Sequence, residues 1–553
     1  MRLPLALITN VRLLNSGFRI GHRIHNGVTK TSLLSSCNIC SRVERKWIKP
    51  VGFDTGVKTY NSLTKQKEPL VLAQERIATW YSCGPTVYDH AHLGHAWYVS
   101  LLDQVQNVER RSYPYFEINV IHVMVITDID DKIIQRSLEQ NISPTVLARM
   151  HEEEFKRDMQ ALRVLPPAVY MRVTDNIPQI VAFVERIIGN GHVYVTSQGN
   201  VYFDTQSIGD RYGKLVNLGG IVGEGKNCKA LFVWVRNGWQ MYSVFGSQLD
   251  IHSGGIDLAF PHHENEIAQS EAYHQCEQWG NYFLHSGHLH LKGSVEKMSK
   301  SLKNYVTIKD FLESYTANEF RLFCLLTRYR SAIDYSDASM NEARSTLSTI
   351  SAFCHTAQAY MQGHLQCQPI EEGILWERLS ATQSSVRKAL ADDFDTPKAV
   401  NVIMSLIHHG NCQLQPATKN NGPRCPAVFG AMLSYVREIM AVFGVDLLDR
   451  KEVHDSSGVL NNVVEELVHF RSKVRKFALS VEDQASQNPQ TGSEIQKRHP
   501  QPDRVPLLKV CDALRNNLAP LGVHIKVRFL PIRLSAAELL KENSWLLYKH
   551  GTL

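Results

Sequence analysis

Three apolar segments, each ending in a polar loop, most constrain the fold of this 553-residue chain. The first leads from Val71 into Tyr81-Ser-Cys-Gly-Pro85, the second runs from Ile118 to Thr127, and the third from Leu249 to Phe260. A segment between the first two has the character of a helix that opens at His92. Strands that stop at polar loops, with helices between them, are typical of a parallel α/β sheet with its site at the strand carboxyl ends. The sequence predicts such a sheet.

The length of the chain predicts several domains, because one hydrophobic core rarely organises so many residues. We expect the sheet domain to cover residues 70–315 and to contain a largely helical insertion at about 136–225. Residues 316–480 are helical in pattern almost throughout. A polar stretch without periodicity, residues 481–505, is interpreted as a linker, and residues 506–553 form a C-terminal segment.

The first 43 residues account for the net positive charge. The chain has 60 basic and 54 acidic side chains, and this segment holds six of the basic ones and no Asp or Glu. The rest of the chain is therefore neutral, and its overall charge does not indicate nucleic-acid binding. An acid-free segment with Arg, Ser, Leu and Ile is typical of a mitochondrial import peptide, which predicts a cleaved leader and a location in the matrix. A disordered basic tail and, less favoured, a secretory signal are the alternatives.

Composition also limits the partners and the redox chemistry. No apolar stretch is long enough to span a membrane, so no membrane partner is expected. The eleven cysteines are scattered and odd in number, which favours free thiols over a disulfide framework.

The tetrapeptide His92-Leu-Gly-His95 at a helix start is suited to holding ATP. The first turn of a helix offers free N–H groups and a positive dipole to phosphates. Gly94 permits close approach of a nucleotide, and His92 and His95 lie three residues apart on one face, where both can donate to phosphate oxygens. Taken alone, the tetrapeptide is equally consistent with two surface histidines.

A second basic segment, Lys297-Met-Ser-Lys-Ser301, lies about two hundred residues downstream. Lys297 and Lys300 on a loop could close over a triphosphate and neutralise the leaving pyrophosphate. Alone it reads as a solvated basic turn, but the ordered pair of motifs resembles the signature of class I aminoacyl-tRNA synthetases.

Three side chains suggest a metal site. In Phe260-Pro-His-His-Glu-Asn-Glu266 a helix is expected after Pro261, which places His262 and Glu266 four residues apart on one face. Cys83 would add a thiolate, giving one S, one N and one O ligand for Zn²⁺ with an open position. The alternative is that His262 and Glu266 only cap and solvate a helix.

Taken together, the motifs closely resemble those of the cysteinyl-tRNA synthetases in their mitochondrial form, over about residues 70–530. The matching segments are Cys83-Gly-Pro-Thr-Val-Tyr-Asp89, His92–His95, Thr127-Asp-Ile-Asp-Asp-Lys-Ile-Ile134, Asp250-Ile-His-Ser-Gly-Gly255, Phe260–Glu266, Lys297–Ser301, Tyr329–Ser336 and Asp392-Asp-Phe-Asp-Thr-Pro397. The resemblance implies a Rossmann-like parallel-sheet catalytic domain followed by a mainly α-helical tRNA-binding region. It also implies a monomer that joins L-cysteine to tRNA(Cys) through cysteinyl-adenylate.

The same resemblance implies residue roles. One Zn²⁺ per chain would bind Cys83, His262 and Glu266, and the thiolate of the substrate would bind the zinc. ATP, with Mg²⁺, would contact the His92 and His95 pair, Gly94, Lys300 and Ser301. The cysteine pocket would be lined by Gly84, Thr127, Trp239 and His252.

Two segments depart from the family pattern. Where a further zinc-binding cysteine is expected, the chain reads Gly238-Trp-Gln-Met-Tyr-Ser-Val-Phe245, and no cysteine lies between Cys228 and Cys276. Ser243 and Cys228 are the nearest substitutes, and a serine hydroxyl is a poor zinc ligand. The stretch from Ala96 to His122 also matches poorly.

These departures leave three alternatives to an active ligase. The chain could be an impaired variant that only binds tRNA or a partner. It could join cysteine to a small amine, although the long helical half argues against a small acceptor. A pyridoxal-phosphate-linked persulfide synthase would need lysines of the Lys-Ile-Ile-Lys type, of which Lys132-Ile-Ile-Gln135 keeps one.

Overall fold

The computed structural model describes most of the chain between residues 47 and 447 and short pieces beyond. The described residues are 47–99, 118–197, 199–216, 244–291, 298, 305–365, 367–415, 424–447, 467, 469–475, 477–478, 504–518, 523–525 and 547–549. The expected leader (1–43), the linker (481–505) and the replaced segment around Trp239 lie largely or wholly outside them.

A five-stranded sheet carries the site, and its strand order is β5-β4-β3-β8-β9. The strands are β3 (Ile77–Thr86), β4 (Asn119–Thr127), β5 (Val169–Arg172), β8 (Leu249–Gly255) and β9 (Gly280–Ser286). Every neighbouring pair is parallel, so the predicted parallel α/β sheet is confirmed. The chain leaves β3 towards β4 on one side and returns in β8 on the other, so the strand order reverses at β3. Ligands of open α/β sheets bind at such a reversal.

Strands β8 and β9 are buried on both faces, as strands of a covered parallel sheet are, whereas the edge strand β5 has no buried residue. In β3, Trp80 packs into the larger core, whereas Tyr81 and Cys83 belong to a second cluster with Ile267 of α7 (Glu264–His274). Since side chains alternate between faces along a strand, Cys83 and Tyr81 share the α7 face. This alternation places the Cys83 thiol against the helix that carries Glu266.

The segment expected to be a helical insertion also contributes the edge strand β5. Its other elements are α3 (Asp131–Gln140), α4 (Pro144–Ala161), η1 (Thr174–Asn176), α5 (Ile177–Gly189), the antiparallel pair β6 (Val193–Val195) and β7 (Val201–Phe203), and η2 (Thr205–Arg211). Ser143 caps α4 by accepting from the N–H of Val146, and Pro144 follows at the first helical position, where no hydrogen bond is lost. The predicted boundaries of the insertion remain predictions.

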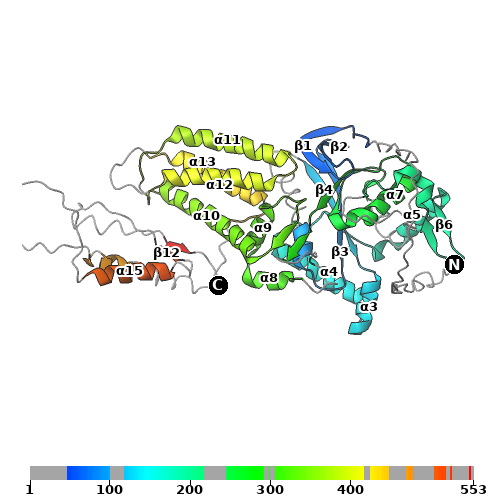
Figure 1. Cartoon of the computed structure of the whole chain (residues 1–553), viewed down its shortest axis with the longest axis horizontal. Helices are drawn as coiled ribbons and strands as arrows, with labels where there is room; N and C mark the ends of the chain where they lie inside the picture. The colour runs from blue at the N-terminus through cyan, green and yellow to red at the C-terminus, as the bar shows by residue number, and fades with distance from the viewer. Residues whose placement is uncertain are drawn as a thin grey trace, which may run out of the picture. The chain divides into compact units, whose positions relative to one another are not determined.

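The region after residue 316 is mainly helical, as expected (Figure 1). Its helices are α9 (Ala317–Leu325), α10 (Asp337–Met361), α11 (Glu372–Ala391), α12 (Thr396–Gln413), α13 (Pro426–Val442) and α15 (Val505–Leu518), preceded by α8 (Ile308–Ser314). Helices α10, α11, α12 and α13 contact one another as a bundle. Two short strand pairs accompany them, β10 (Leu289–Leu291) with β11 (Ile333–Tyr335) and β12 (Val523–Ile525) with β13 (Leu547–Lys549). Among the described residues, no helix is both long enough and apolar enough to cross a bilayer.

An N-terminal hairpin, β1 (Phe53–Asn61) and β2 (Gln66–Leu72), is tied to this bundle by Asp393. The N–H of Asp393 donates to the Lys58 carbonyl at 2.7 Å, and its Oδ1 accepts from the Tyr60 N–H at 2.8 Å and the Tyr329 hydroxyl at 2.9 Å. Its Oδ2 accepts from Arg330 at 2.9 Å. The motif at residues 392–397 therefore joins chain segments more than three hundred residues apart.

A buried arginine makes a second connection. Arg321 of α9 is fully buried and donates through Nε and a terminal nitrogen to the carbonyl of Phe443, just after α13, at 3.0 and 2.9 Å. It also donates at 3.4 Å to the carbonyl of Arg163, which follows α4. Gly444 has φ +73°, and a Cβ there would lie 2.4 Å from the Arg321 guanidinium. The guanidinium therefore fills the space that this glycine leaves.

Candidate active site

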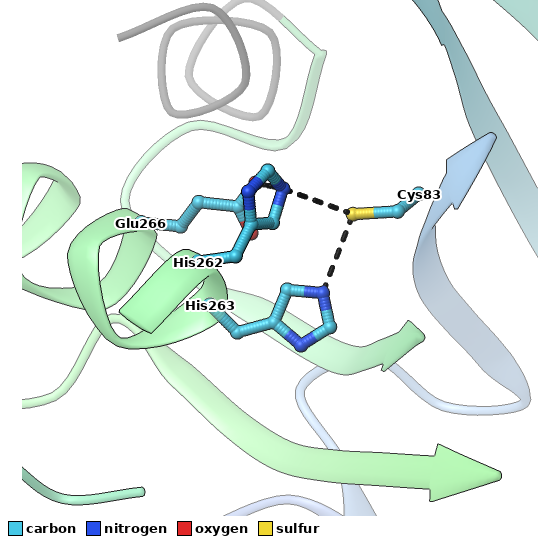
Figure 2. Close-up of side chains that lie close together, drawn as sticks. All are labelled: Cys83, His262, His263 and Glu266. Atoms are coloured by element: carbon cyan, nitrogen blue, oxygen red, sulfur yellow. Dashed lines mark hydrogen bonds and ion pairs between the residues drawn. The ribbon is translucent and has the colours of Figure 1, made fainter. Parts of the chain in front are cut away.

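Four side chains converge beside the carboxyl end of β3 (Figure 2). The Cys83 Sγ lies 3.8 Å from His262 Nε2 and 3.4 Å from His263 Nε2. His262 Nε2 lies 3.3 Å from Glu266 Oε1. All four groups are buried, and one ligand atom from each lies within 4.8 Å of the others. Cys83, His262 and Glu266, the three residues that the sequence grouped together, are therefore in contact.

His263 is a member of this cluster that the sequence analysis missed. Consecutive residues of a regular α-helix point about 100° apart, so His262 and His263 were not expected to face one ligand. Here α7 begins only at Glu264, and the preceding wide turn, Ala259–His263, contains Phe260 in an extended conformation. The widened turn brings both imidazoles to Cys83.

Glu266 is held as a carboxylate inside the protein. His252 Nε2 donates to Glu266 Oε2 at 2.7 Å, and the other oxygen, Oε1, is buried with His262 Nε2 3.3 Å away as its ion-pair partner. Burial by itself raises the pKa of Glu266, but the neighbouring His262 and His252 have the larger, opposite effect. The pKa of Glu266 is therefore lowered to about 2. A buried carboxylate oxygen within 4.8 Å of two histidine nitrogens and a cysteine sulfur suits a metal ion.

Burial also makes the thiol of Cys83 a poor acid in the protein alone. Desolvation and the charge of Glu266 raise the pKa of Cys83 well above its usual range. A metal cation would reverse this, because coordination deprotonates a thiol. The donor set of one sulfur, two nitrogens and one oxygen is one that Zn²⁺ accepts.

His252 packs against two aromatic rings beside the cluster. It is fully buried, stacks on Phe283 with ring centroids 4.8 Å apart and lies 4.9 Å from the Tyr81 ring. In the register of the sheet it is opposite Tyr81, two residues before Cys83. Its hydrogen bond to Glu266 connects His252 directly to one member of the cluster.

Gly84 is required by the sheet. A Cβ at Gly84 would lie 2.2 Å from the Val125 carbonyl oxygen, where the pairing of β3 with β4 becomes irregular. Thr127 lies at the end of β4 opposite Thr86, and its carbonyl accepts from the Val87 N–H at 3.2 Å. Both residues lie at the carboxyl edge, near Cys83 in sequence and register.

The His92-Leu-Gly-His95 motif begins the helical residues 93–99, as predicted. The rings of His92 and His95 have centroids 3.9 Å apart, which confirms that they share one face. The Gly94 N–H donates to His92 Nδ1 at 3.1 Å, and a Cβ at Gly94 would come within 2.9 Å of that ring. The glycine therefore lets the His92 ring fold back over the helix start.

The second basic motif is represented by one described residue, Met298. It is buried, its N–H donates to the Leu289 carbonyl at 3.0 Å, and its own carbonyl lies 3.6 Å from the Cβ position of Gly94. The two motifs are therefore adjacent, although the side chains of Lys297, Lys300 and Ser301 lie outside the described residues. Trp239 also lies outside them.

A smaller cluster lies beside the His92 motif. Glu154 of α4 accepts from His90 Nδ1 at 2.7 Å and from His151 Nδ1 at 3.1 Å. Burial raises the pKa of nearby Asp158 to about 6, and the negative charge of Glu154 adds to the effect.

Similarity to known proteins decides the family. A family model described as the class I (C) tRNA synthetase catalytic domain matches residues 69–220 and 232–345. The chain is 51% identical over 528 residues to a Xenopus tropicalis protein named "Probable cysteine--tRNA ligase, mitochondrial", covering 89% of this chain and 92% of that one. The chain belongs to the cysteine–tRNA ligase family.

Further relatives agree with this assignment. A cytoplasmic cysteine–tRNA ligase of Dictyostelium discoideum is 35% identical, with 87% of this chain and 77% of that one covered. The crystal structure of Mycobacterium tuberculosis methionyl-tRNA synthetase with methionyl-adenylate superimposes with a TM-score of 0.53 at 15% identity, over 67% of this chain and 92% of that one. This likeness supports the class I synthetase fold. The cysteine–tRNA ligase resemblance read from the motifs is confirmed.

Proposed function

We propose that this chain is an active mitochondrial cysteine–tRNA ligase, which activates L-cysteine with ATP and transfers it to tRNA(Cys). The observation that carries the proposal is the contact of Cys83, His262 and Glu266 at the carboxyl edge of the sheet. Such a cluster suits a thiol substrate, and its Cys83 lies on β3, the strand that leads into the nucleotide motif. An impaired variant is not favoured, because the described residues offer a complete set of metal donors even though the expected second cysteine is absent.

The nucleotide would bind at the start of the helical residues 93–99. The positive end of the helix dipole would attract phosphate oxygens, and His92 and His95 would donate to the α-phosphate as negative charge develops. Lys297 and Lys300 would bind the leaving pyrophosphate, with Ser301 and Mg²⁺ at the triphosphate. The cysteine carboxylate would attack the α-phosphate in line, so catalysis consists of positioning and charge stabilisation.

Cys83, His262 and Glu266 would hold one Zn²⁺ per chain. The ion would supply a soft site that prefers the sulfur of cysteine to the hydroxyl of serine. His252 would fix the Glu266 carboxylate through its hydrogen bond, which is the usual role of a second group behind a metal ligand. With Gly84, Thr127 and Trp239 it would also line the cysteine pocket.

The remaining parts would serve delivery and tRNA binding. Residues 1–43 would direct the chain to the mitochondrial matrix and be removed there. The helices of residues 316–480 would bind tRNA(Cys), the terminal adenosine 2′-hydroxyl would attack the adenylate, and the enzyme would act as a monomer.

The proposal is tested by cysteine-dependent exchange of pyrophosphate into ATP, together with the zinc content of the purified full chain. We expect near one zinc per chain and exchange that is lost in Cys83→Ala. Cys276→Ala is the matched control, because Cys276 is a partly buried free thiol outside the cluster. Wild-type protein without zinc and without exchange would refute the proposal, and exchange unaffected by Cys83→Ala would refute the role of the thiol.

A further inference from the structure

Three separations among the four donor atoms are close to those of a tetrahedral zinc site, and all the others lie within 4.8 Å. With zinc bonds of about 2.3 Å to sulfur and about 2.05 Å to nitrogen or oxygen, tetrahedral ligands lie about 3.6 Å (S to N) and about 3.3 Å (N to O) apart. The two S–N separations at Cys83 are 3.8 and 3.4 Å, and the His262–Glu266 separation is 3.3 Å. His263 therefore fits the set as well as His262 does.

A chain of hydrogen bonds holds the His263 ring from behind. Its Nδ1 lies 2.8 Å from His285 Nε2, and His285 Nδ1 lies 2.7 Å from the Ser62 hydroxyl. When His263 Nδ1–H donates to His285, and His285 Nδ1–H donates to Ser62, the lone pair of His263 Nε2 faces Cys83. A hydrogen bond from the far nitrogen is the usual support of a metal-bound histidine.

Gly254 of β8 makes room for this ring. A Cβ at Gly254 would lie 2.2 Å from Cε1 and 2.7 Å from Nε2 of His263. Any side chain at this position would force the ligand edge of the imidazole away from Cys83. The strand that supplies His252 therefore also accommodates His263.

We infer that His263 is the fourth protein ligand of the zinc site, with Cys83, His262 and Glu266, an inference that rests on the proposed zinc site. It occupies the coordination position for which the sequence between Cys228 and Cys276 offers no second thiolate. Two imidazoles, one thiolate and one carboxylate leave the zinc centre neutral, whereas a second thiolate would make it anionic. A neutral centre repels the thiolate of an incoming substrate less, and with four protein ligands that thiolate would bind as a fifth ligand rather than at an open fourth position.

X-ray absorption at the zinc edge of the full chain tests the inference directly. We expect a fit with two imidazoles and one sulfur in the wild type, and with one imidazole in His263→Ala. Gly254→Ala should also remove one imidazole from the fit while every ligand side chain remains. His122→Gln is the matched control, since His122 is a buried histidine of the same sheet bonded to Ser82 outside the cluster; it should keep both imidazoles.

Competition with a chelator gives the second measurement. Loss of one ligand of four should weaken zinc binding roughly 100-fold in His263→Ala, and His122→Gln should stay near the wild type. One imidazole in the wild-type spectrum, or unchanged affinity in His263→Ala, would overturn the role of His263 while leaving zinc on the other three residues. A wild-type chain that binds no zinc would overturn the proposed zinc site itself. If a variant fails to fold, the number of imidazoles in the wild-type spectrum still decides whether His263 is a ligand.

Discussion

Arg321 should be one of the most sensitive positions outside the active site. Arg321→Met removes the donors to the Phe443 and Arg163 carbonyls and leaves acceptors among buried groups. A hydrogen bond from a charged donor contributes about 1.5–3 kcal/mol, and a stranded buried acceptor costs about 1–3 kcal/mol. Burying methionine instead of a guanidinium recovers part of this loss, because the charge no longer has to be desolvated. We expect a net loss of about 3 kcal/mol.

Hydrogen exchange of the full chain measures this loss where it arises. A loss of about 3 kcal/mol corresponds to exchange about 100-fold faster in peptides from α9 and α13, if both open together. Arg321→Lys should show a smaller effect, because it keeps the charge but not the branched donor. Arg344→Met is the control, since Arg344 of α10 is 44% exposed and pairs with Glu319 of α9, the helix that carries Arg321; it should cost less than about 1 kcal/mol. Equal exchange rates in Arg321→Met and Arg344→Met would refute the reasoning.

Three further predictions concern the site and its surroundings. Gly84→Ala should strain the β3–β4 pairing by about 1–3 kcal/mol and lower cysteine-dependent exchange. Gly373→Ala in α11, which meets no atom within 4 Å, should leave exchange unchanged and should not lower the melting temperature, because alanine is the better helix former. Asp158→Asn should stabilise the protein by about 1 kcal/mol at pH 7.5. Its raised pKa of about 6 means that the folded state binds the extra proton, so stability falls as pH rises from about 4 to 6, and the gain should vanish at pH 4 in denaturant titrations. Glu266→Gln should keep the hydrogen bond from His252 but weaken zinc binding roughly 100-fold in chelator competition, and unchanged affinity would exclude Glu266 as a ligand.

Local sequence patterns predicted the contacts that depend on regular spacing. The approach of His262 to Glu266, and the pairing of His92 with His95, follow from the positions of residues along a helix turn. The contact of His263 with Cys83 could not be predicted in this way, because it depends on the wide turn at Ala259–His263, which the spacing of residues does not indicate. His252 was assigned to the pocket, but its hydrogen bond to Glu266 needed the register between β3 and β8.

Contacts between segments far apart in the sequence could not be predicted either. The hairpin β1–β2 lies largely before the predicted start of the sheet domain at residue 70, and its partner Asp393 lies far along the helical half. Nothing in the alternation of the hairpin indicates this partner. Similarly, β5 was hidden within a segment whose overall pattern is helical, because its four residues are too few for periodicity to show.

The Asp393 connection limits how this protein can be divided. A fragment cut to the span of the family model, residues 69–345, would lose β1, the first three residues of β2 and the carboxylate that accepts from Tyr60 and Tyr329. The Tyr329 hydroxyl would remain in the fragment without this acceptor, and the edge of β9 that contacts β1 would be uncovered. The smallest fragment that keeps these contacts runs from about the start of β1 through the first turns of α12. Domain exchange between relatives should therefore transfer the hairpin and the Asp393 motif together.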